Sequence, residues 1–304
     1  MAIKDRLKLD PEKERREIER FIRDACDLFG KDGAVIGLSG GIDSSLASIL
    51  TAEAIGPERV KGIIMPERES SPKSEEDALK LAEKIGIATE KVDITPILNC
   101  VGLYKHIPKP VFANRKVGAF ITKTGFEIFS KMRGKDPFIE GLKGTDSLLL
   151  KRVNTYYRLK HRIRMVILYT YADRENRLVV GTSNKTEYLT GFFVKYGDGA
   201  SDIMPLLHLY KTQVKELAKY MGVPDEIIKK PPSPDLLPGI EDEMALGMSY
   251  NKLDLILAGM EEGLGDEEIE REAGVRRGDI ERVREMVRSS EYMRSWPLDL
   301  KGGR

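Results

Sequence analysis

Residues 37–45 read Gly-Leu-Ser-Gly-Gly-Ile-Asp-Ser-Ser and bring glycines, hydroxyls and one carboxylate into a single short turn. They follow the apolar run 34–36 and precede a helical pattern, so they are expected to join a strand to a helix N-terminus. Backbone N–H groups and the helix dipole at such a junction favour phosphate, and paired glycines let phosphate oxygens approach closely. The sequence therefore predicts a phosphate-binding loop made of Gly37, Leu38, Ser39, Gly40, Gly41, Ile42, Asp43, Ser44 and Ser45.

Asp43 is a carboxylate inside this anion-binding loop, where a negative charge makes sense only if a cation accompanies the phosphates. Mg²⁺ prefers carboxylate and phosphate oxygens as ligands, so Asp43 is predicted to bind magnesium. The loop lacks the Gly-Lys-Ser/Thr of a Walker A motif, and the chain lacks Gly-x-Gly-x-x-Gly. The alternative interpretation of the string is an ordinary connection between a strand and a helix.

A second polar turn, residues 181–187, follows the apolar run 178–180. Its Thr182 can donate a hydrogen bond to phosphate or adenosine, and its Glu187 could hold a cation opposite Asp43. Further along, Lys211 begins a helical pattern and is a candidate cation for phosphate. Alone, each feature would equally suit a capped surface turn or a surface lysine.

A third segment, residues 191–205, mixes glycines and aromatics with Lys195, Asp198 and Asp202. The glycines would let the backbone approach a ligand, and the charges could orient it. The competing interpretation is a solvated loop containing charged pairs.

Short apolar runs alternate with helical patterns through the first part of the chain. We expect strands at 34–38, 60–65, 88–94 and 177–181, separated by helices at 44–55, 72–85 and 149–174. This alternation predicts an α/β fold with a Rossmann-like, doubly wound parallel sheet and helices on both faces. Ligands in such sheets bind at the carboxyl ends of the strands, where the first two polar turns fall.

From about residue 211 the chain reads as a helical C-terminal part, with helices expected at 211–221, 248–262, 266–273 and 279–290. Gly274-Val275 resembles the corner of a helix-turn-helix. Residues 266–288 carry eight acidic and six basic side chains, which is a poor surface for DNA phosphates. Packing against the rest of the protein is the better interpretation.

Residues 103–145 are rich in glycine, lysine, proline and aromatics and show little periodicity. We expect a long excursion from a single domain spanning 1–304. Two roles are open for it: a cover that orders over the site when substrates bind, or a fixed element of a dimer interface.

Composition limits the functional classes. The 304 residues include 50 basic and 49 acidic side chains, a net charge of +1 that gives no reason to expect nucleic-acid or membrane binding. The chain shows no signal-peptide pattern and no apolar run of membrane-spanning length, so a cytoplasmic location is expected. Cys26 and Cys100 predict neither a disulfide framework nor a metal cluster. Cys26 falls on the apolar stripe of the first helix, which is expected between the N-cap Asp10 and Gly30.

The Ser-Gly-Gly-Ile-Asp-Ser string resembles the pyrophosphate-binding loop of the ATP pyrophosphatase superfamily, whose members cleave ATP to AMP and pyrophosphate. Together with strings further along, most of the chain resembles the NAD synthetase family. The strings that carry this resemblance are 37–45, 161–165, 181–187, 191–205, 209–214, 232–236, 242–243, 246–247 and 253–254.

The resemblance implies a homodimer that converts deamido-NAD to NAD with ATP, Mg²⁺ and ammonia. It places ATP on residues 37–45, Thr182, Lys211 and Ser233, and magnesium on Asp43 and Glu187. It places deamido-NAD on Arg162, Lys195 and Asp202, and offers Asp198 and Glu243 as weaker candidates for an ammonia site.

Three features depart from the family pattern: Arg158 stands where asparagine is usual, Tyr292-Met293 stands for His-Lys, and the excursion is long. Only 38 residues precede Ser39, too few for an amidohydrolase domain, so free ammonia or ammonia from a separate protein is expected. The alternatives are another ATP pyrophosphatase, such as a GMP synthetase or a tRNA-thiolating enzyme, and a non-catalytic nucleotide sensor.

Overall fold

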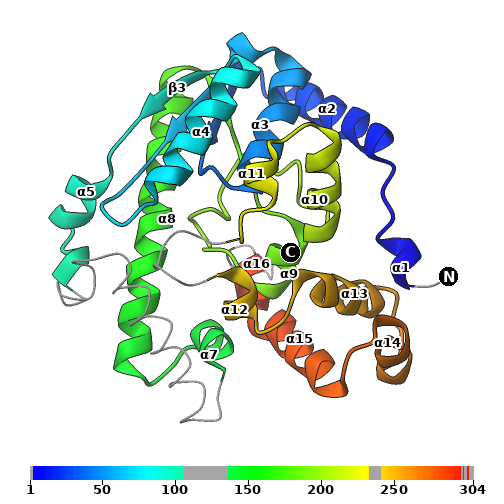
Figure 1. Ribbon diagram of the computed structural model, residues 1–304. Helices are drawn as coiled ribbons and strands as arrows, with labels where there is room; N and C mark the ends of the chain where they lie inside the picture. The colour runs from blue at the N-terminus through cyan, green and yellow to red at the C-terminus, as the bar shows by residue number, and fades with distance from the viewer. Residues whose placement is uncertain (1–2, 106–135, 233–240, 296, 298–299, 301–304) are drawn as a thin grey trace.

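The computed structural model describes residues 3–105, 136–232, 241–295, 297 and 300 (Figure 1). Residues 106–135 of the expected excursion, and with them its predicted role, lie outside the described residues, as does Ser233.

Four parallel strands form one sheet in the order β3-β2-β1-β4. Their bounds are β1 (Gly33–Gly37), β2 (Val60–Ile64), β3 (Ala88–Lys91) and β4 (Arg177–Val180). Ile36 of β1 is in register with Gly62 of β2 and with Val180 of β4. The chain moves outward from β1 through β2 to β3 and then returns to the other side of β1. This reversal between β1 and β4 is a topological switch point, where such sheets bind ligands.

Helices cover both faces of the sheet. Successive side chains of β1 point to opposite faces, so the strand contributes to a separate core on each face. Ala34 and Ile36 belong to a core with five α-helices, and Val35 belongs to a second core with two other α-helices. The helices on the first face are α2 (Pro11–Leu28), α3 (Ile42–Ile55), α4 (Pro72–Ile85), α10 (Lys211–Tyr220) and α11 (Asp225–Ile228), and those on the second are α5 (Thr95–Cys100) and α8 (Leu148–Arg174). The predicted Rossmann-like sheet is confirmed.

The C-terminal part is helical, as expected, and has its own core with α1 and α7. Its helices are α12 (Asp242–Leu246), α13 (Tyr250–Glu261), α14 (Asp266–Ala273), α15 (Arg277–Ser289) and α16 (Glu291–Arg294), next to α1 (Ile3–Arg6) and α7 (Pro137–Lys143). Ile269 and Ile280 flank the Gly274 corner and are fully buried. The two helices therefore pack on the C-terminal core through these residues, while Gly274 itself is exposed.

Several expected bounds shift in the structure. β3 ends at Lys91 rather than at 94, because Ile94 is buried where the chain turns into α5. Helix α7 lies within the expected excursion and was not predicted. Its N-cap Asp136 accepts hydrogen bonds from the N–H groups of Phe138 and Ile139. Cys26 is buried in the core, as its place on the apolar stripe predicted.

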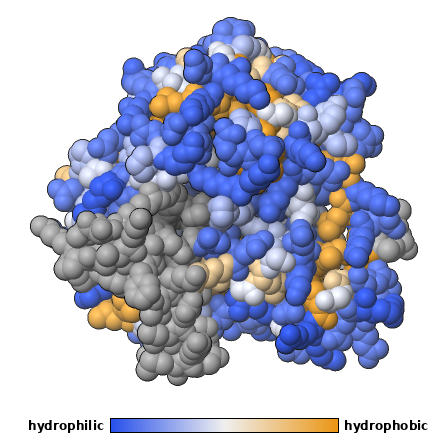
Figure 2. Space-filling view, in the orientation of Figure 1, coloured by the Kyte–Doolittle hydropathy of each residue, from blue (hydrophilic) through white to orange (hydrophobic). Residues whose placement is uncertain are grey.

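The surface in view is mainly hydrophilic, with apolar residues exposed in small areas (Figure 2). Within the described ranges, no helix is both long and apolar enough to cross a bilayer.

Candidate active site at the switch point

The predicted phosphate loop joins β1 to α3. Gly40 has φ +69°, and a Cβ there would lie 2.1 Å from the carbonyl oxygen of Ser74, so only glycine fits. Ser39 is exposed on the loop, and its Oγ lies 2.9 Å from that of Ser44. Ser45 is buried and donates to the Gly41 carbonyl at 2.8 Å. The Ser44 and Ser45 hydroxyls thus brace the loop from inside, whereas Ser39 faces outward.

Asp43, Glu187 and Lys211 meet beside this loop. Lys211 is the first residue of α10 and only 2% of its side chain is exposed. Its Nζ lies 2.5 Å from Asp43 Oδ2 and 3.2 Å from Glu187 Oε1. We define these three residues as the charged cluster. It joins the ends of β1 and β4 across the switch point, so the structure brings together three residues that are far apart in sequence.

Asn184 fixes the two carboxylates relative to each other. It is the N-cap of α9 (Lys185–Thr190), where its side chain accepts the N–H of Glu187 at 3.0 Å. Its Nδ2 donates to Asp43 Oδ1 at 2.9 Å. The sequence analysis did not select Asn184, although Asn followed three residues later by Glu is a capping-box pattern.

The charged cluster has two carboxylates for one ammonium. Burial and the nearby Asp43 together raise the pKa of Glu187 to about 8, despite the opposing effect of Lys211. Burial lowers the pKa of Lys211, but the carboxylates of Asp43 and Glu187 outweigh it and raise that pKa overall. The carboxylates therefore favour the charged form of Lys211, and burial with the nearby Asp43 favours the protonated form of Glu187.

Hydrogen bonds from α9 and α10 to one buried carboxylate set the positions of these two helices. Asp254 on α13 is fully buried and accepts the Thr186 hydroxyl at 2.6 Å and the Thr212 N–H at 2.8 Å. The Thr186 hydroxyl oxygen in turn accepts the N–H of Lys211 at 2.9 Å. One carboxylate thus orients the helix that carries Glu187 and the helix that carries Lys211.

Asp242, rather than Glu243, lies near the charged cluster. Asp242 Oδ2 accepts the Tyr250 hydroxyl at 2.9 Å, and its buried Oδ1 has no hydrogen-bond partner among the described residues. Burial raises the pKa of Asp242, and Lys211 acts to lower it. Glu243 accepts the N–H of Tyr250 at 3.0 Å, at the start of α13. The sequence analysis selected Glu243, whereas its neighbour Asp242 is the one that lies near the charged cluster.

The predicted residues of the 191–205 segment form a separate group against α8. Asp202 accepts the Val179 N–H at 2.7 Å and the Tyr169 hydroxyl at 3.1 Å. Asp198 accepts the Val194 N–H at 2.7 Å. In the described part of the chain, no hydrogen bond or ion pair joins Asp198 or Asp202 to the charged cluster.

Lys195 of the same segment contacts Arg162 of α8 and the end of α16. Lys195 Nζ donates to the carbonyls of Tyr292 and Ser295, at 2.8 and 2.7 Å, and so holds the end of α16. Arg162 reaches the Lys195 carbonyl at 3.5 Å. Thr182 is the second residue after β4 and is half-buried.

Arg158 binds the Gly141 carbonyl of α7 at 3.0 Å. This departure from the family pattern thus links α8 to α7.

A buried ionic network that the sequence analysis did not predict lies at the carboxyl end of β2. Lys160 of α8 is fully buried, and its Nζ lies 2.8 Å from Glu67 Oε1 and 2.9 Å from Glu69 Oε2. The hydroxyls of Tyr104 and Tyr156 donate to Glu67 and Glu69 respectively. This network, Glu67, Glu69, Lys160 and the two tyrosines, fixes the turn after β2 onto α8.

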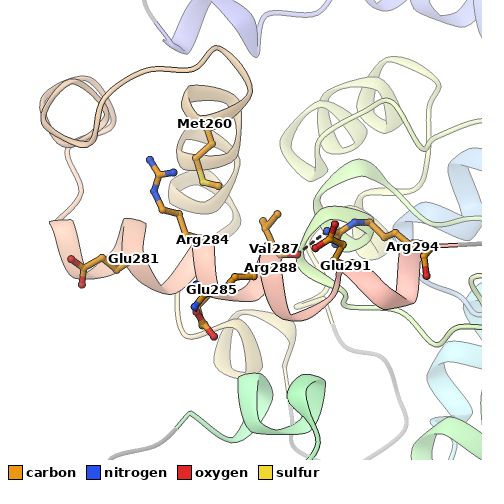
Figure 3. Close-up of a pocket in the computed structure, with 9 residues that line it drawn as sticks. Met260, Glu281, Arg284, Glu285, Val287, Arg288, Glu291 and Arg294 are labelled. Atoms are coloured by element: carbon orange, nitrogen blue, oxygen red, sulfur yellow. Dashed lines mark hydrogen bonds and ion pairs between the residues drawn. The ribbon is translucent and has the colours of Figure 1, made fainter. Parts of the chain in front are cut away.

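Figure 3 shows a pocket of about 940 Å³ along α15 and α16. Its charged side chains are bonded locally: Arg288 pairs with Glu285, and Arg294 donates to the Val287 carbonyl at 2.7 Å. None of the residues that line it was predicted to bind a substrate. The charged cluster at the switch point is therefore the stronger candidate for chemistry.

Comparisons with known proteins agree on one family. A family model described as NAD synthase matches residues 14–112 and 149–297. An NH(3)-dependent NAD(+) synthetase from Thermotoga neapolitana is 45% identical over 281 residues, 91% of this chain and 93% of the relative.

Solved structures have the same fold. NMN synthetase from Francisella tularensis matches with a TM-score of 0.70 and 29% identity, over 96% of this chain and 99% of that one. NH3-dependent NAD synthetase from Campylobacter jejuni, in complex with a nitrate ion, matches with a TM-score of 0.67 and 26% identity, over 96% of this chain and 100% of that one.

Proposed function

This chain belongs to the NAD synthase family, and we propose that it is a ligase that amidates deamido-NAD to NAD with ammonia and ATP. The observation that carries the proposal is the meeting of Asp43, Glu187 and Lys211 beside a glycine loop at the switch point. A site that only bound adenosine would not need two carboxylates beside the phosphate loop, which counts against a nucleotide sensor.

The proposed reaction has two steps. An oxygen of the nicotinate carboxylate attacks the α-phosphorus of ATP, the bond from that phosphorus to the bridging oxygen breaks, and pyrophosphate leaves. Ammonia then attacks the activated carbonyl carbon, the bond to AMP breaks, and the nitrogen loses a proton. The protein must align the two reactants, stabilise the leaving pyrophosphate and exclude water from the adenylate.

The residues at the switch point suit the first step. The N–H groups of the loop at the start of α3 would hold the pyrophosphate portion of ATP. Asp43 and Glu187 fit Mg²⁺, which is usually held by one or two carboxylates together with substrate phosphates and water. Bound there, the ion would neutralise charge on the phosphates. Lys211 would then be released from the carboxylates to donate to a phosphate oxygen.

The remaining roles are assigned by family resemblance. Thr182 and Ser233 would contact ATP. Arg162, Lys195 and Asp202 would contact deamido-NAD, with Lys195 exchanging its carbonyl partners at the end of α16 for the substrate. For the proton released by ammonium, Asp198 and Glu243 stay candidates, and the placement of Asp242 adds a third carboxylate.

We also propose a cytoplasmic homodimer that uses free ammonia or a separate ammonia donor. Leu148, Leu149 and Val166 of α8 are apolar and exposed, which supports burial of that helix between subunits. Sedimentation of the purified protein settles the subunit count. The near balance of 50 basic and 49 acidic residues supports small-molecule substrates over nucleic acid.

The purified chain is expected to make NAD from deamido-NAD only when ATP, Mg²⁺ and an ammonium salt are all present, releasing AMP and pyrophosphate. The reason is that adenylation breaks the bond between the α- and β-phosphates. Product chromatography and a coupled pyrophosphate assay measure both products. Formation of ADP and phosphate would reject adenylation.

Three further substrates test the alternatives in the same assay: XMP, tRNA and the mononucleotide of nicotinic acid. The last belongs here because one structural relative is an NMN synthetase. We expect deamido-NAD to give the highest kcat/KM, since the relative at 45% identity is an NAD synthetase. A higher value for any of the other three would replace the proposed substrate.

The affinity for a Mg²⁺–ATP analogue is expected to rise with pH up to about 8 and then to level off. Burial raises the pKa of Glu187 to about 8, and a carboxylate must lose its proton before it binds a metal. Below that pH, each pH unit should weaken binding about tenfold. Calorimetry at several pH values measures this, and Glu187→Gln, which has no such proton to lose, is the matched control. An identical pH dependence in both proteins would remove Glu187 from the metal site.

A further inference from the structure

Lys230 lies just beyond α11 (Asp225–Ile228) and outside every predicted site. Its ammonium nevertheless contacts the phosphate loop, at the carbonyl of Gly40. Its Nζ lies 2.8 Å from Ser74 Oγ, 3.4 Å from the Gly40 carbonyl oxygen and 3.4 Å from Asp77 Oδ2. Only 30% of its side chain is exposed. Lys230 is therefore fixed in place by three partners, unlike a typical solvent-exposed lysine.

The contact with Gly40 bears on phosphate binding because a trans peptide is planar, and its C=O and N–H point in opposite directions. The Gly40 carbonyl belongs to the same peptide unit as the Gly41 N–H. Holding the carbonyl on the Lys230 side therefore turns this N–H to the other side of the loop. There the Gly41 N–H reaches the exposed Ser39 hydroxyl at 3.3 Å, a long bond that an anion could replace.

The partners of Lys230 are themselves fixed. Ser74 and Asp77 belong to α4 and are buried. Asp77 Oδ1 also lies 2.8 Å from Lys73 Nζ, so two ammonium groups share this carboxylate. Gly40 packs so closely on the first turn of α4 that a Cβ would collide with the Ser74 carbonyl. The loop is thus seated on α4, and Lys230 fastens the contact.

We propose that Lys230 is a positioning residue for the phosphate loop: it does not touch ATP, but it holds the 40–41 peptide so that the Gly41 N–H faces the pyrophosphate. The inference rests on the proposed function only in taking a phosphorylated substrate at this loop. It predicts a loss confined to binding of the pyrophosphate portion, with contacts to the adenosine and to deamido-NAD preserved.

The test measures binding of inorganic pyrophosphate, with Mg²⁺, and of adenosine to the full chain by calorimetry. Lys230→Met is expected to weaken pyrophosphate binding about tenfold, the usual size of one lost hydrogen bond to a charged group, and adenosine binding less than twofold. Lys229→Met is the matched control, because the neighbouring Lys229 is exposed and pairs only locally with Asp225. It should bind both ligands like the unmodified protein.

A second variant keeps the test valid if Lys230→Met unfolds. Ser74→Ala removes the hydroxyl that holds Lys230 and should produce a smaller loss of the same kind, and the double variant should be no worse than Lys230→Met alone. Unchanged pyrophosphate binding, or equal loss for adenosine and pyrophosphate, would overturn the proposal. Because neither ligand reacts, a chain that fails to make NAD would still give a clear result.

Discussion

Asp43→Asn is expected to lower kcat about a thousandfold while leaving the melting temperature unchanged or higher. The change removes a carboxylate that the proposed magnesium site needs, but keeps the shape of the side chain and an acceptor for Asn184 or Lys211. The charged cluster holds two partly buried carboxylates for one ammonium, so the substitution removes surplus negative charge from the folded protein. If Asp43 served folding alone, its substitution would lower the melting temperature and leave kcat nearly unchanged.

Steady-state kinetics and thermal unfolding of the same preparation measure both quantities. Asp225→Asn is the control, because Asp225 forms an exposed pair with Lys229 far along the chain from the loop. Its kcat and melting temperature should match the unmodified protein. A marked drop in the melting temperature of Asp43→Asn, or a kcat within tenfold of normal, would make Asp43 a structural residue.

Lys160→Met is expected to reduce the free energy of unfolding by about 3–5 kcal/mol. The ammonium of Lys160 lies between Glu67 and Glu69, and all three side chains are buried. Methionine fills a similar volume but leaves Glu67 without a cation in the interior, and leaves Glu69 with only the partly exposed Arg68, at 3.1 Å. Urea unfolding at neutral pH measures the change.

Two controls separate charge from packing at this position. Lys80→Met alters an exposed lysine of α4 and should change the free energy of unfolding by less than about 1 kcal/mol. Adding Glu67→Gln and Glu69→Gln to Lys160→Met removes the two carboxylate charges. This triple variant should recover part of the lost free energy of unfolding. If Lys160→Met alone proved as stable as the unmodified protein, the network would contribute nothing to stability.

The parts of this protein that were predictable from sequence are those in which local pattern and chemistry coincide. The 37–45 loop could be identified because its glycines, its flanking strand and its helix lie within a dozen residues. The sheet followed from regular alternation of apolar runs and helices. The pairing of β1 with β4 was not predictable in this way, because no local pattern states which distant strand completes the sheet.

The site was harder to predict where function depends on tertiary contacts. Asn184 could have been found from its capping pattern, but its bond to Asp43 depends on the strand order. Asp242 and Glu243 are adjacent acids of α12, and which of them lies near Lys211 depends on how α12 packs against Tyr250 of α13. Lys160 lies on a long helix with many basic residues, and its burial depends on carboxylates that follow β2.

The pairing of β1 with β4 also determines when during synthesis the enzyme becomes competent. Gly33 pairs with Arg177, and the support from Asp254 comes later still. While the chain is being translated, Asp43 leaves the ribosome long before Glu187 and Lys211 exist, and β1 has one open edge. A nascent chain therefore holds a glycine loop without its charged partners. The charged cluster can therefore assemble only after most of the polypeptide has been made.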